Sequence, residues 1–285
     1  MTPQFVAVGH VTLDHFGEDV RPGGTALYAA LTAHRLGCSV GLLTSFGPDF
    51  PRSLFPPEIE VAHVPSPKTT VFRHETGRAA RRLTVLGRAA DLETGHLPAS
   101  FKAAELALLG PDTSEVDPYL AAEFTEGAVG AAAQGWLRAR GAGGVISPAS
   151  WQDAALVLPH IQALFLSEED LGPYGEEAVE WFQQIPFGVI TLGSRGAYLF
   201  VSGERYFIEA EPADEVDATG AGDVFATAFL IDYQRHGNPW EAAQFAACAA
   251  ALSVEGIGVA AIPRRAAVEE RVAAYRRRFG RAEAT

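Results

Sequence analysis

Short runs of consecutive apolar residues recur along the chain and are separated by segments with helical periodicity. Phe5–Val8, Leu106–Leu109 and Ala163–Leu166 have the length and composition of strands that are buried on both faces. Such strands, when helices connect them, form a mostly parallel sheet covered by helices. The pattern therefore predicts an α/β fold.

The pattern changes between residues 61 and 92. Lys68–Glu75 and Arg81–Leu86 are rich in β-branched residues and flank a turn that contains Gly77, which is typical of a hairpin. With the short segment 11–20, the range 61–92 is expected to supply the strands of a second, smaller sheet. We expect residues 1–285 to form a single α/β domain that carries this small sheet.

Composition narrows the possible partners. The chain has 285 residues, 48% of them hydrophobic, which is enough for a large core. Its net charge of −13 argues against nucleic acid or an anionic membrane as the main partner, because both need a basic surface. The arginines at 276–278 and 281 are explained by the C-terminal end of a helix.

The cysteines and the N-terminus indicate a cytoplasmic protein. Only Cys38 and Cys248 occur, and each lies in a helical context, so we expect reduced thiols instead of a disulfide or a metal site. The first residues are not basic and the apolar stretch after them is short, so no signal peptide is predicted. No apolar run has the length of a membrane span.

The segment Asp217-Ala218-Thr219-Gly220-Ala221-Gly222-Asp223 carries the clearest chemistry. Its glycines stand directly before an apolar helical run, so the loop delivers backbone amides to a helix N-terminus, which favours an anion such as phosphate. A carboxylate at Asp223 repels that anion unless it has a function, and a general base is the function we infer. Ordinary capping by an acid in a first helical turn is the alternative.

The order Asp-x-Thr-Gly-Ala-Gly-Asp closely resembles the C-terminal signature of the ribokinase-like (PfkB) carbohydrate kinases, with Ala218 as a departure at the second position. The resemblance implies a three-layer α/β/α domain in which the small β-sheet is a lid over the acceptor. It also implies phosphoryl transfer from ATP to an alcohol. Asp223 is then the base, and Gly220, Ala221 and Gly222 form the anion hole.

The N-terminal part resembles the acceptor site of the same family. Asp14 follows the first strand, and Gly23-Gly24 opens an Ala- and Leu-rich helix, as in the family's first signature. The resemblance implies that Asp14, Gly23 and Gly24 contact the acceptor. Tyr28 stands where many members have Asn, so a ribose or fructose pocket does not follow.

Gln134-Gly135-Trp136-Leu137-Arg138 is a further candidate for acceptor binding. The polar side chains of Gln134 and Arg138 can reach a substrate, although a surface turn with one buried tryptophan accounts for the same residues. Together with Tyr28, this segment is similar to the inositol- and nucleoside-type branches and favours a cyclic polyol.

Two glycine-rich turns resemble the ATP site of the family. The resemblance implies that a strand–turn–strand element near the donor phosphates and a later loop over the adenine bind ATP. Many members hold a monovalent cation between that loop and Asp217, and a requirement for K⁺ is left open. The residues implied in ATP binding are Thr191, Gly193, Arg195, Gly196, Ser253 and Gly256.

Ser167-Glu168-Glu169-Asp170 resembles the family's Asn-x-x-Glu motif, which organises Mg²⁺. Both substitutions keep oxygen ligands, as a hard cation requires. A serine cap followed by acids in a first helical turn explains the segment equally well. The expected metal ligands are Asp170, Glu169 and Asp217.

Other nucleotide and metal sites do not match. Neither lysine follows a glycine, which excludes a P-loop, and Phe225 occupies the third glycine position of a dinucleotide fingerprint. No His-Glu-x-x-His or paired cysteine motif suggests zinc.

Two functions remain. The first is a kinase for a sugar, cyclic polyol or nucleoside, with a possible homodimer through the lid. The second is a catalytically weak or inactive ligand-binding regulator.

Overall fold

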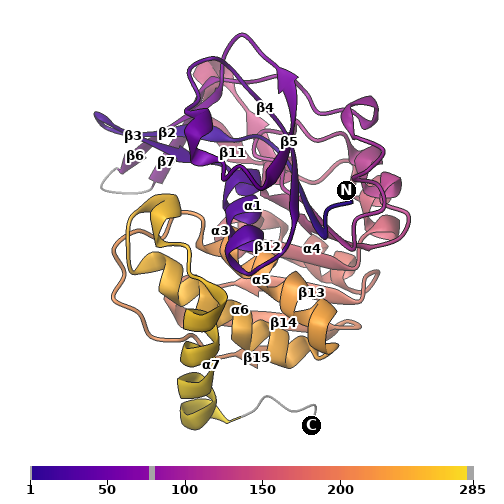
Figure 1. The fold of residues 1–285 in the computed structure, drawn as a ribbon, viewed down its shortest axis with the longest axis vertical. Helices are drawn as coiled ribbons and strands as arrows, with labels where there is room; N and C mark the ends of the chain where they lie inside the picture. The colour runs from indigo at the N-terminus through magenta and orange to yellow at the C-terminus, as the bar shows by residue number, and fades with distance from the viewer. Residues whose placement is uncertain (1, 77–80, 281–285) are drawn as a thin grey trace.

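The computed structural model describes residues 2–76 and 81–280. Its centre is a nine-stranded sheet in the order β15-β14-β13-β12-β9-β8-β1-β4-β5 (Figure 1). Neighbours from β13 to β5 pair in parallel, whereas β14 and β15 are antiparallel. The strands are β1 (Phe5–Val8), β4 (Val40–Phe46), β5 (Ile59–Pro65), β8 (Leu106–Leu109), β9 (Ala128–Ala132), β12 (Ala163–Ser167), β13 (Phe187–Thr191), β14 (Ala197–Val201) and β15 (Glu204–Ile208).

Helices cover both faces of this sheet, and each face has its own apolar core. Along β1, Phe5 and Ala7 point into one core and Val6 and Val8 into the other, so the continuous apolar run reflects burial on both sides. The first core contains α1 (Thr25–Arg35), α5 (Ala221–His236), α6 (Pro239–Val254) and α7 (Arg265–Phe279). The second contains α2 (Ala154–Val157), α3 (Glu168–Leu171) and α4 (Gly175–Phe182). The expected three-layer α/β/α architecture is confirmed.

Short 3₁₀ helices complete the connections between these elements. They are η1 (Arg52–Leu54), η2 (Thr94–His96), η3 (Pro118–Glu123), η4 (Ala133–Leu137), η5 (Ala142–Gly144), η6 (Leu158–His160), η7 (Gly172–Tyr174), η8 (Gly193–Arg195) and η9 (Gly258–Ala261). A two-stranded ribbon, β10 (Arg138–Arg140) and β11 (Ile146–Pro148), follows η4.

A four-stranded sheet projects from one side of the body, at the upper left of Figure 1. Its order is β3-β2-β6-β7, with β2 and β6 parallel and the outer pairs antiparallel. The strands are β2 (Thr12–Phe16), β3 (Asp19–Gly23), β6 (Thr70–Thr76) and β7 (Arg81–Gly87). The predicted turn at Gly77 lies outside the described residues.

The expected range 61–92 for strands of the small sheet is too wide. Residues 61–65 belong to β5, which pairs in parallel with β4 at the edge of the large sheet. Residues 61–64 are all half-buried, as edge strands of either sheet can be, so their sequence does not show which sheet they join. At the other end, β3 extends the small sheet to Gly23.

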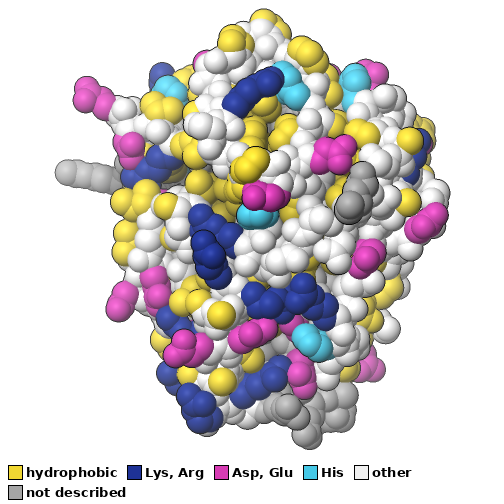
Figure 2. Space-filling view, viewed as in Figure 1, with side chains coloured by type: hydrophobic (Ala, Val, Ile, Leu, Met, Phe, Trp, Pro, Cys, Tyr) yellow, Lys and Arg dark blue, Asp and Glu magenta, His cyan; other side chains and the backbone are white. Residues whose placement is uncertain are grey.

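The surface charges, the two cysteines and the helix lengths can be compared with what the sequence predicts. On the face seen in Figure 2, basic side chains lie among acidic ones and do not form one continuous patch. Cys38 and Cys248 are both free, and Cys248 is buried. Within residues 2–76 and 81–280, no helix is both long and apolar enough to cross a membrane.

Candidate active site

The segment 217–223 forms a loop that ends in the first turn of α5. Gly220 adopts the left-handed conformation, with φ 78° and ψ 1°, and α5 begins at the next residue. Gly220 has no side chain with which to cap the helix, so the amides of Gly222 and Asp223 are available to a ligand, whereas the Ala221 amide donates to the carbonyl of Ala218 at 3.3 Å. Asp223 lies in that first turn. The structure therefore places the predicted base beside the predicted anion hole.

The ring of Tyr28 packs against this loop at Gly220. Tyr28 lies in α1 and is only 2% exposed. A Cβ on Gly220 would fall 2.5 Å from Cζ of the ring, so only glycine fits at this position. The Tyr28 hydroxyl is buried and has no hydrogen-bond partner in the described part of the chain. Tyr28 thus lies beneath the anion loop, with its ring out of contact with solvent.

The Asp223 carboxylate is partly buried among other acids. Burial is the main cause that raises its pKa to about 7, and the charges of Asp170 and Asp14 raise it further. A hydrogen bond from Thr25 and the charge of Arg138 act in the opposite direction. A carboxyl group that titrates near neutral pH is suited to take up a proton during catalysis.

A chain of side-chain hydrogen bonds leads from Arg138 to this carboxylate. The Arg138 guanidinium donates to Oε1 of Gln134 at 2.7 Å. Gln134 donates through Nε2 to Oγ1 of Thr25 at 2.7 Å, so the Thr25 hydroxyl has its own proton left to donate to a carboxylate. Two carboxylates lie within its reach, Oδ1 of Asp112 at 3.4 Å and Asp223. The structure therefore brings Gln134 and Arg138 to the predicted site, where they orient Thr25.

Asp14 and the diglycine meet at the junction of the small sheet and α1. A Cβ on Gly23 would lie 3.0 Å from Cγ of Asp14, and one on Gly24 would lie 2.6 Å from the carbonyl oxygen of His10. Gly24 also has a φ of +94°, which side chains disfavour. His74 of β6 lies 3.8 Å from the Asp14 carboxylate. The diglycine is thus needed for the close approach of backbone and acid.

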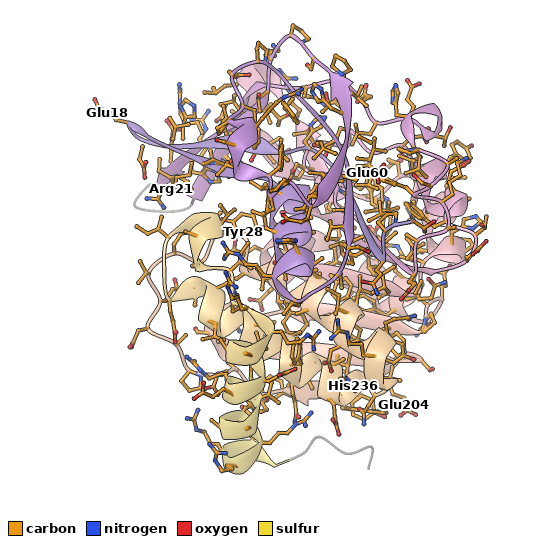
Figure 3. The ribbon with its side chains drawn as sticks, viewed as in Figure 1. Glu18, Arg21, Tyr28, Glu60, Glu204 and His236 are labelled. Carbon is orange, nitrogen blue, oxygen red and sulfur yellow. The ribbon has the colours of Figure 1, made fainter. Side chains whose placement is uncertain are left out.

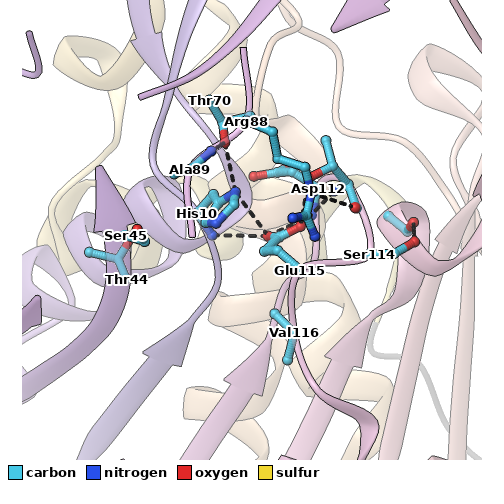
Figure 4. Close-up of polar contacts among 12 residues, drawn as sticks. His10, Thr44, Ser45, Thr70, Arg88, Ala89, Asp112, Ser114, Glu115 and Val116 are labelled. Carbon is cyan, nitrogen blue, oxygen red and sulfur yellow. Dashed lines mark hydrogen bonds and ion pairs between the residues drawn. The ribbon is translucent and has the colours of Figure 1, made fainter. Parts of the chain in front are cut away.

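Behind the diglycine lies a fully buried pair, His10 and Glu115 (Figure 4). Glu115 accepts hydrogen bonds from the backbone amides of His10 at 3.0 Å and Thr113 at 2.6 Å. The His10 ring contacts the Thr70 hydroxyl at 2.7 Å and the Ala90 carbonyl at 2.8 Å. Burial alone would raise the pKa of Glu115, but the neighbouring His10 and these amides hold it below its ordinary value. The cluster ties the end of β1 to the loop after β8.

Asp112 lies next to this pair and faces the diglycine. It is 3% exposed, and its Oδ2 has no hydrogen-bond partner among the described residues. Burial, followed by the charge of Glu115, raises its pKa well above the ordinary value. Oδ2 lies 3.1 Å from the position of a Cβ on Gly24. Burial thus favours the neutral form of Asp112, whose Oδ2 faces the acceptor side of the site.

Asp217, at the start of the loop, is held by several donors. Its Oδ1 accepts from the amide of Thr219 at 3.0 Å, and its Oδ2 accepts from the amide of Gly258 at 3.1 Å. Oδ2 also pairs with the guanidinium of Arg21 at 3.0 Å. Arg21 is on the small sheet, near Tyr28 in Figure 3.

The candidate donor residues lie at the ends of β12 and β13. Thr191 is the register partner of Ser167, where both strands end, and its hydroxyl donates to the carbonyl of Leu166 at 3.4 Å. Arg195 follows in the next turn, is largely exposed, and pairs with Glu168. The turn between β13 and β14 is left-handed at Gly193 (φ 60°) and Gly196 (φ 103°).

The two other candidate donor residues lie at the end of α6. Ser253 is 5% exposed and its hydroxyl donates back to the carbonyl of Ala250 at 2.8 Å, as serines within helices do. Gly256 follows α6, and a Cβ there would lie 3.1 Å from that of Ala261. The positions fit the expected loop, but the Ser253 hydroxyl is already bonded within its helix.

The sequence matches the pfkB family carbohydrate kinases over residues 12–265. The chain belongs to the PfkB family. Among curated proteins, it is 26% identical over 265 residues to the cytidine kinase of Thermococcus kodakarensis, a match that covers 83% of this chain and 90% of that kinase. It is 34% identical over 121 residues to the ribokinase of Arabidopsis thaliana, of which the match spans only 31%.

Solved structures of PfkB-type kinases share the fold. A pyrophosphate-dependent kinase of the ribokinase family, complexed with a pyrophosphate analogue and myo-inositol, matches with a TM-score of 0.78 at 20% identity, over 93% of this chain and 99% of the other. The Arabidopsis thaliana ribokinase complexed with ribose and ATP matches with a TM-score of 0.70 at 18% identity, over 95% of this chain and 99% of the other. The expected ribokinase-like fold is confirmed.

The expected metal ligands of this PfkB chain do not form one cluster. In residues 2–76 and 81–280, no group of three or more His, Cys, Asp or Glu side chains could hold an ion. Asp170 accepts from the amide and hydroxyl of Ser167 at 3.1 and 2.6 Å, whereas Glu169 is exposed. The acids near Asp223 still leave the site rich in negative charge, which suits a magnesium ion that arrives bound to donor phosphates.

Sequence reasoning missed Thr25, Asp112 and Arg21. Thr25 directly follows the diglycine, and Asp112 follows a buried strand just as Asp14 does, so the chain order alone could have suggested both. Arg21 offered no such signal, because its partner Asp217 is 196 residues away in the chain.

Proposed function

We propose that this chain is an ATP-dependent kinase that transfers the γ-phosphoryl group to a hydroxyl group of a sugar, a cyclic polyol or a nucleoside. One observation carries the proposal. Asp223, with a pKa raised to about 7 mainly by burial, lies in the first turn of α5, a helix whose N-terminus at Gly220 has no side-chain cap. A base and an anion hole on one helical turn suit an in-line phosphoryl transfer.

In this mechanism Asp223 takes the proton of the acceptor hydroxyl as its oxygen attacks the γ-phosphorus. A bond forms from the acceptor oxygen to phosphorus, and the bond from phosphorus to the bridging oxygen of ATP breaks. The amides of Gly220 and Gly222 stabilise the charge that develops on the transferred group, and the Ala221 amide joins them only by giving up its 3.3 Å bond to the carbonyl of Ala218. Thr25, oriented by Gln134, holds the carboxylate in position to receive the proton.

The acceptor binds between the small sheet and the ends of β1 and β8. Asp14 accepts hydrogen bonds from acceptor hydroxyls, while Gly23 and Gly24 let the backbone approach them. Arg138 and Tyr28 complete this side of the site, Arg138 through the network that it anchors and Tyr28 through the loop that it supports. The small sheet acts as the lid, and its closure excludes water that would compete as an acceptor.

The donor lies along the ends of β12 and β13 and the loop after α6. Thr191, Gly193 and Gly196 lie near its phosphates, and Arg195 is exposed enough to meet their charge. Ser253 and Gly256 border the adenine ring of ATP. Asp170 is the acid of this chain that would lie near a magnesium ion bound to the donor phosphates, and such an ion would supply positive charge to offset theirs.

A cyclic polyol or a nucleoside is the acceptor class that we favour. The relatives support it, since they include a kinase solved with myo-inositol and a cytidine kinase. Tyr28 in place of the family's asparagine agrees with a pocket that differs from that of ribose kinases. We further propose a cytoplasmic location and a homodimer through the outer side of the small sheet.

The test is a phosphorylation assay across pentoses, hexoses, inositols and nucleosides, with Mg²⁺ and either ATP or pyrophosphate as donor. We expect one class of acceptor to give a phosphorylated product with ATP. The Asp223→Asn variant is the control, and it should give no more than background. If ATP binds but no acceptor yields product, the chain is a ligand-binding regulator and the proposal fails; product with pyrophosphate alone overturns the donor assignment.

A further inference from the structure

Arg21 reaches across from the small sheet to the anion loop. It lies in β3, two residues before the diglycine, and its guanidinium pairs with Asp217 at 3.0 Å. Asp19 on the same strand pairs with it at 2.6 Å, and the Phe16 ring lies 5.0 Å from its Cζ. The side chain is 29% exposed, whereas that of Asp217 is only 11% exposed. The arginine is thus held in place on its own sheet and directed at the loop.

Asp217 is the point at which several segments of the body meet. Its carboxylate binds the amides of Thr219 and Gly258, and its own amide donates to the carbonyl of Val254 at 3.2 Å. Asp217 therefore joins the anion loop and the η9 turn through its carboxylate, and the end of α6 through its backbone amide. Burial alone would raise its pKa, but the Thr219 and Gly258 hydrogen bonds and the charge of Arg21 hold it below the ordinary value. The charged form needs a cation, and Arg21 supplies it.

An external monovalent cation does not fit beside the Asp217 carboxylate. Oδ2 of Asp217 already accepts from the Gly258 amide and from Arg21, and Oδ1 accepts from the Thr219 amide. A potassium ion on the same carboxylate would lie beside a fixed guanidinium charge and would be repelled by it. The residues present therefore disagree with a K⁺ site at Asp217.

We propose that Arg21 is a positioning residue that replaces a monovalent cation at Asp217, so that phosphoryl transfer by this chain does not require K⁺. Through the same contact, Arg21 couples the small sheet to the anion loop. This one ion pair then fixes the position of the acceptor-binding diglycine relative to the phosphate-binding amides. This inference rests on the proposed function for its kinetic part only.

The charges around Arg21 support this role. Asp19 and Asp217 both face its guanidinium, so the arginine keeps its positive charge throughout the range in which a kinase works. The buried Tyr28 hydroxyl also lies near Asp217, because it is 3.9 Å from the position of a Cβ on Gly258, whose amide binds the Asp217 carboxylate. Removing the guanidinium leaves a largely buried carboxylate without its cation and opens a space that a small ion can enter.

The experiment compares the wild type with Arg21→Met, Arg21→Lys and, as a matched control, Arg73→Met, which changes an exposed arginine of β6 in the same sheet. Thermal unfolding and turnover are measured in KCl and in choline chloride at equal ionic strength. We expect the wild type and Arg73→Met to give the same Tm and the same rate, within twofold, in both salts.

For Arg21→Met we expect a lower Tm and at least a tenfold lower kcat in choline, with both partly restored by KCl, while KM for the acceptor changes less. Arg21→Lys keeps a cation and should not respond to K⁺. Wild-type protein activated several-fold by K⁺, or Arg21→Met protein that K⁺ does not restore, would overturn the proposal. If the wild type transfers no phosphoryl group, the proposed function fails, and the Tm measurements still decide whether Arg21 replaces an ion.

Discussion

The Tyr28 ring lies so close to Gly220 that a single added methyl group would collide with it. Gly220→Ala should therefore shift the ring or distort the left-handed turn. We expect a loss of about 2–3 kcal/mol in the free energy of unfolding, from backbone strain and overpacking together, and at least a tenfold loss of kcat, measured by denaturant unfolding and steady-state kinetics. Gly222→Ala is the matched control, because a Cβ there meets no described atom within 4 Å. A destabilisation of Gly222→Ala equal to that of Gly220→Ala would contradict this account.

Tyr28→Phe should not destabilise the protein. The Tyr28 hydroxyl is buried without a partner among the described residues, so removing it loses no hydrogen bond and removes the desolvation cost of a polar group. We expect a Tm equal to or above that of the wild type. A rise in acceptor KM at unchanged Tm would show that the hydroxyl binds the acceptor, whereas an unchanged KM would limit Tyr28 to supporting the loop.

The rate should rise with pH through the pKa of Asp223. Burial raises this pKa to about 7, and only the deprotonated carboxylate can take the acceptor proton, so kcat/KM should increase with pH near 7 and level off above it. The Thr25 hydrogen bond lowers the pKa of Asp223. Thr25→Val should therefore move the rising limb to higher pH by about one unit.

The control for Thr25→Val is Thr32→Val in the same helix. The Thr32 hydroxyl is buried and has no partner among the described residues, so its loss should leave the pH profile in place. A profile for Thr25→Val that matches those of Thr32→Val and the wild type would remove Thr25 from the role of holding Asp223.

The effect of Asp112→Asn on stability, relative to the wild type, should become more favourable as the pH rises. The pKa of Asp112 is raised in the folded protein, mainly by burial, so its carboxyl contributes least to folding at pH values above its ordinary range, where the unfolded chain is already deprotonated. Asparagine keeps the shape without this penalty. The measurement is the Tm of the variant minus that of the wild type between pH 4 and pH 8, and we expect it to increase. A decrease over that range would show that Asp112 is stabilised in its charged form.

Local features of the fold could be predicted from the sequence because they depend on neighbouring residues. The apolar runs at Phe5–Val8 and Leu106–Leu109 became parallel, fully buried strands, and the glycines at 220 and 24 took the left-handed conformations that their loops need. The loop at 217–223 placed Asp223 on the first turn of a helix, as the pattern of glycine, acid and apolar run indicated.

Features that depend on tertiary pairing could not be read in this way. Residues 61–64 are all half-buried and carry no pattern that separates the two sheets, and only their register with β4 assigns them to the large one. The bond between Gln134 and Thr25 spans 109 residues, and the pair of Arg21 and Asp217 spans 196. Such contacts follow from the packing of whole elements and leave no local pattern.

The most direct test of the central claim is the single-turnover rate of Asp223→Asn beside its affinity for ATP. The variant keeps the shape of the side chain and the amides at the start of α5 but cannot accept a proton. We predict that ATP binding stays within about threefold of the wild type while the rate falls by a factor of about 10² or more. A variant that binds ATP and retains its rate would contradict the assignment of Asp223 as the general base.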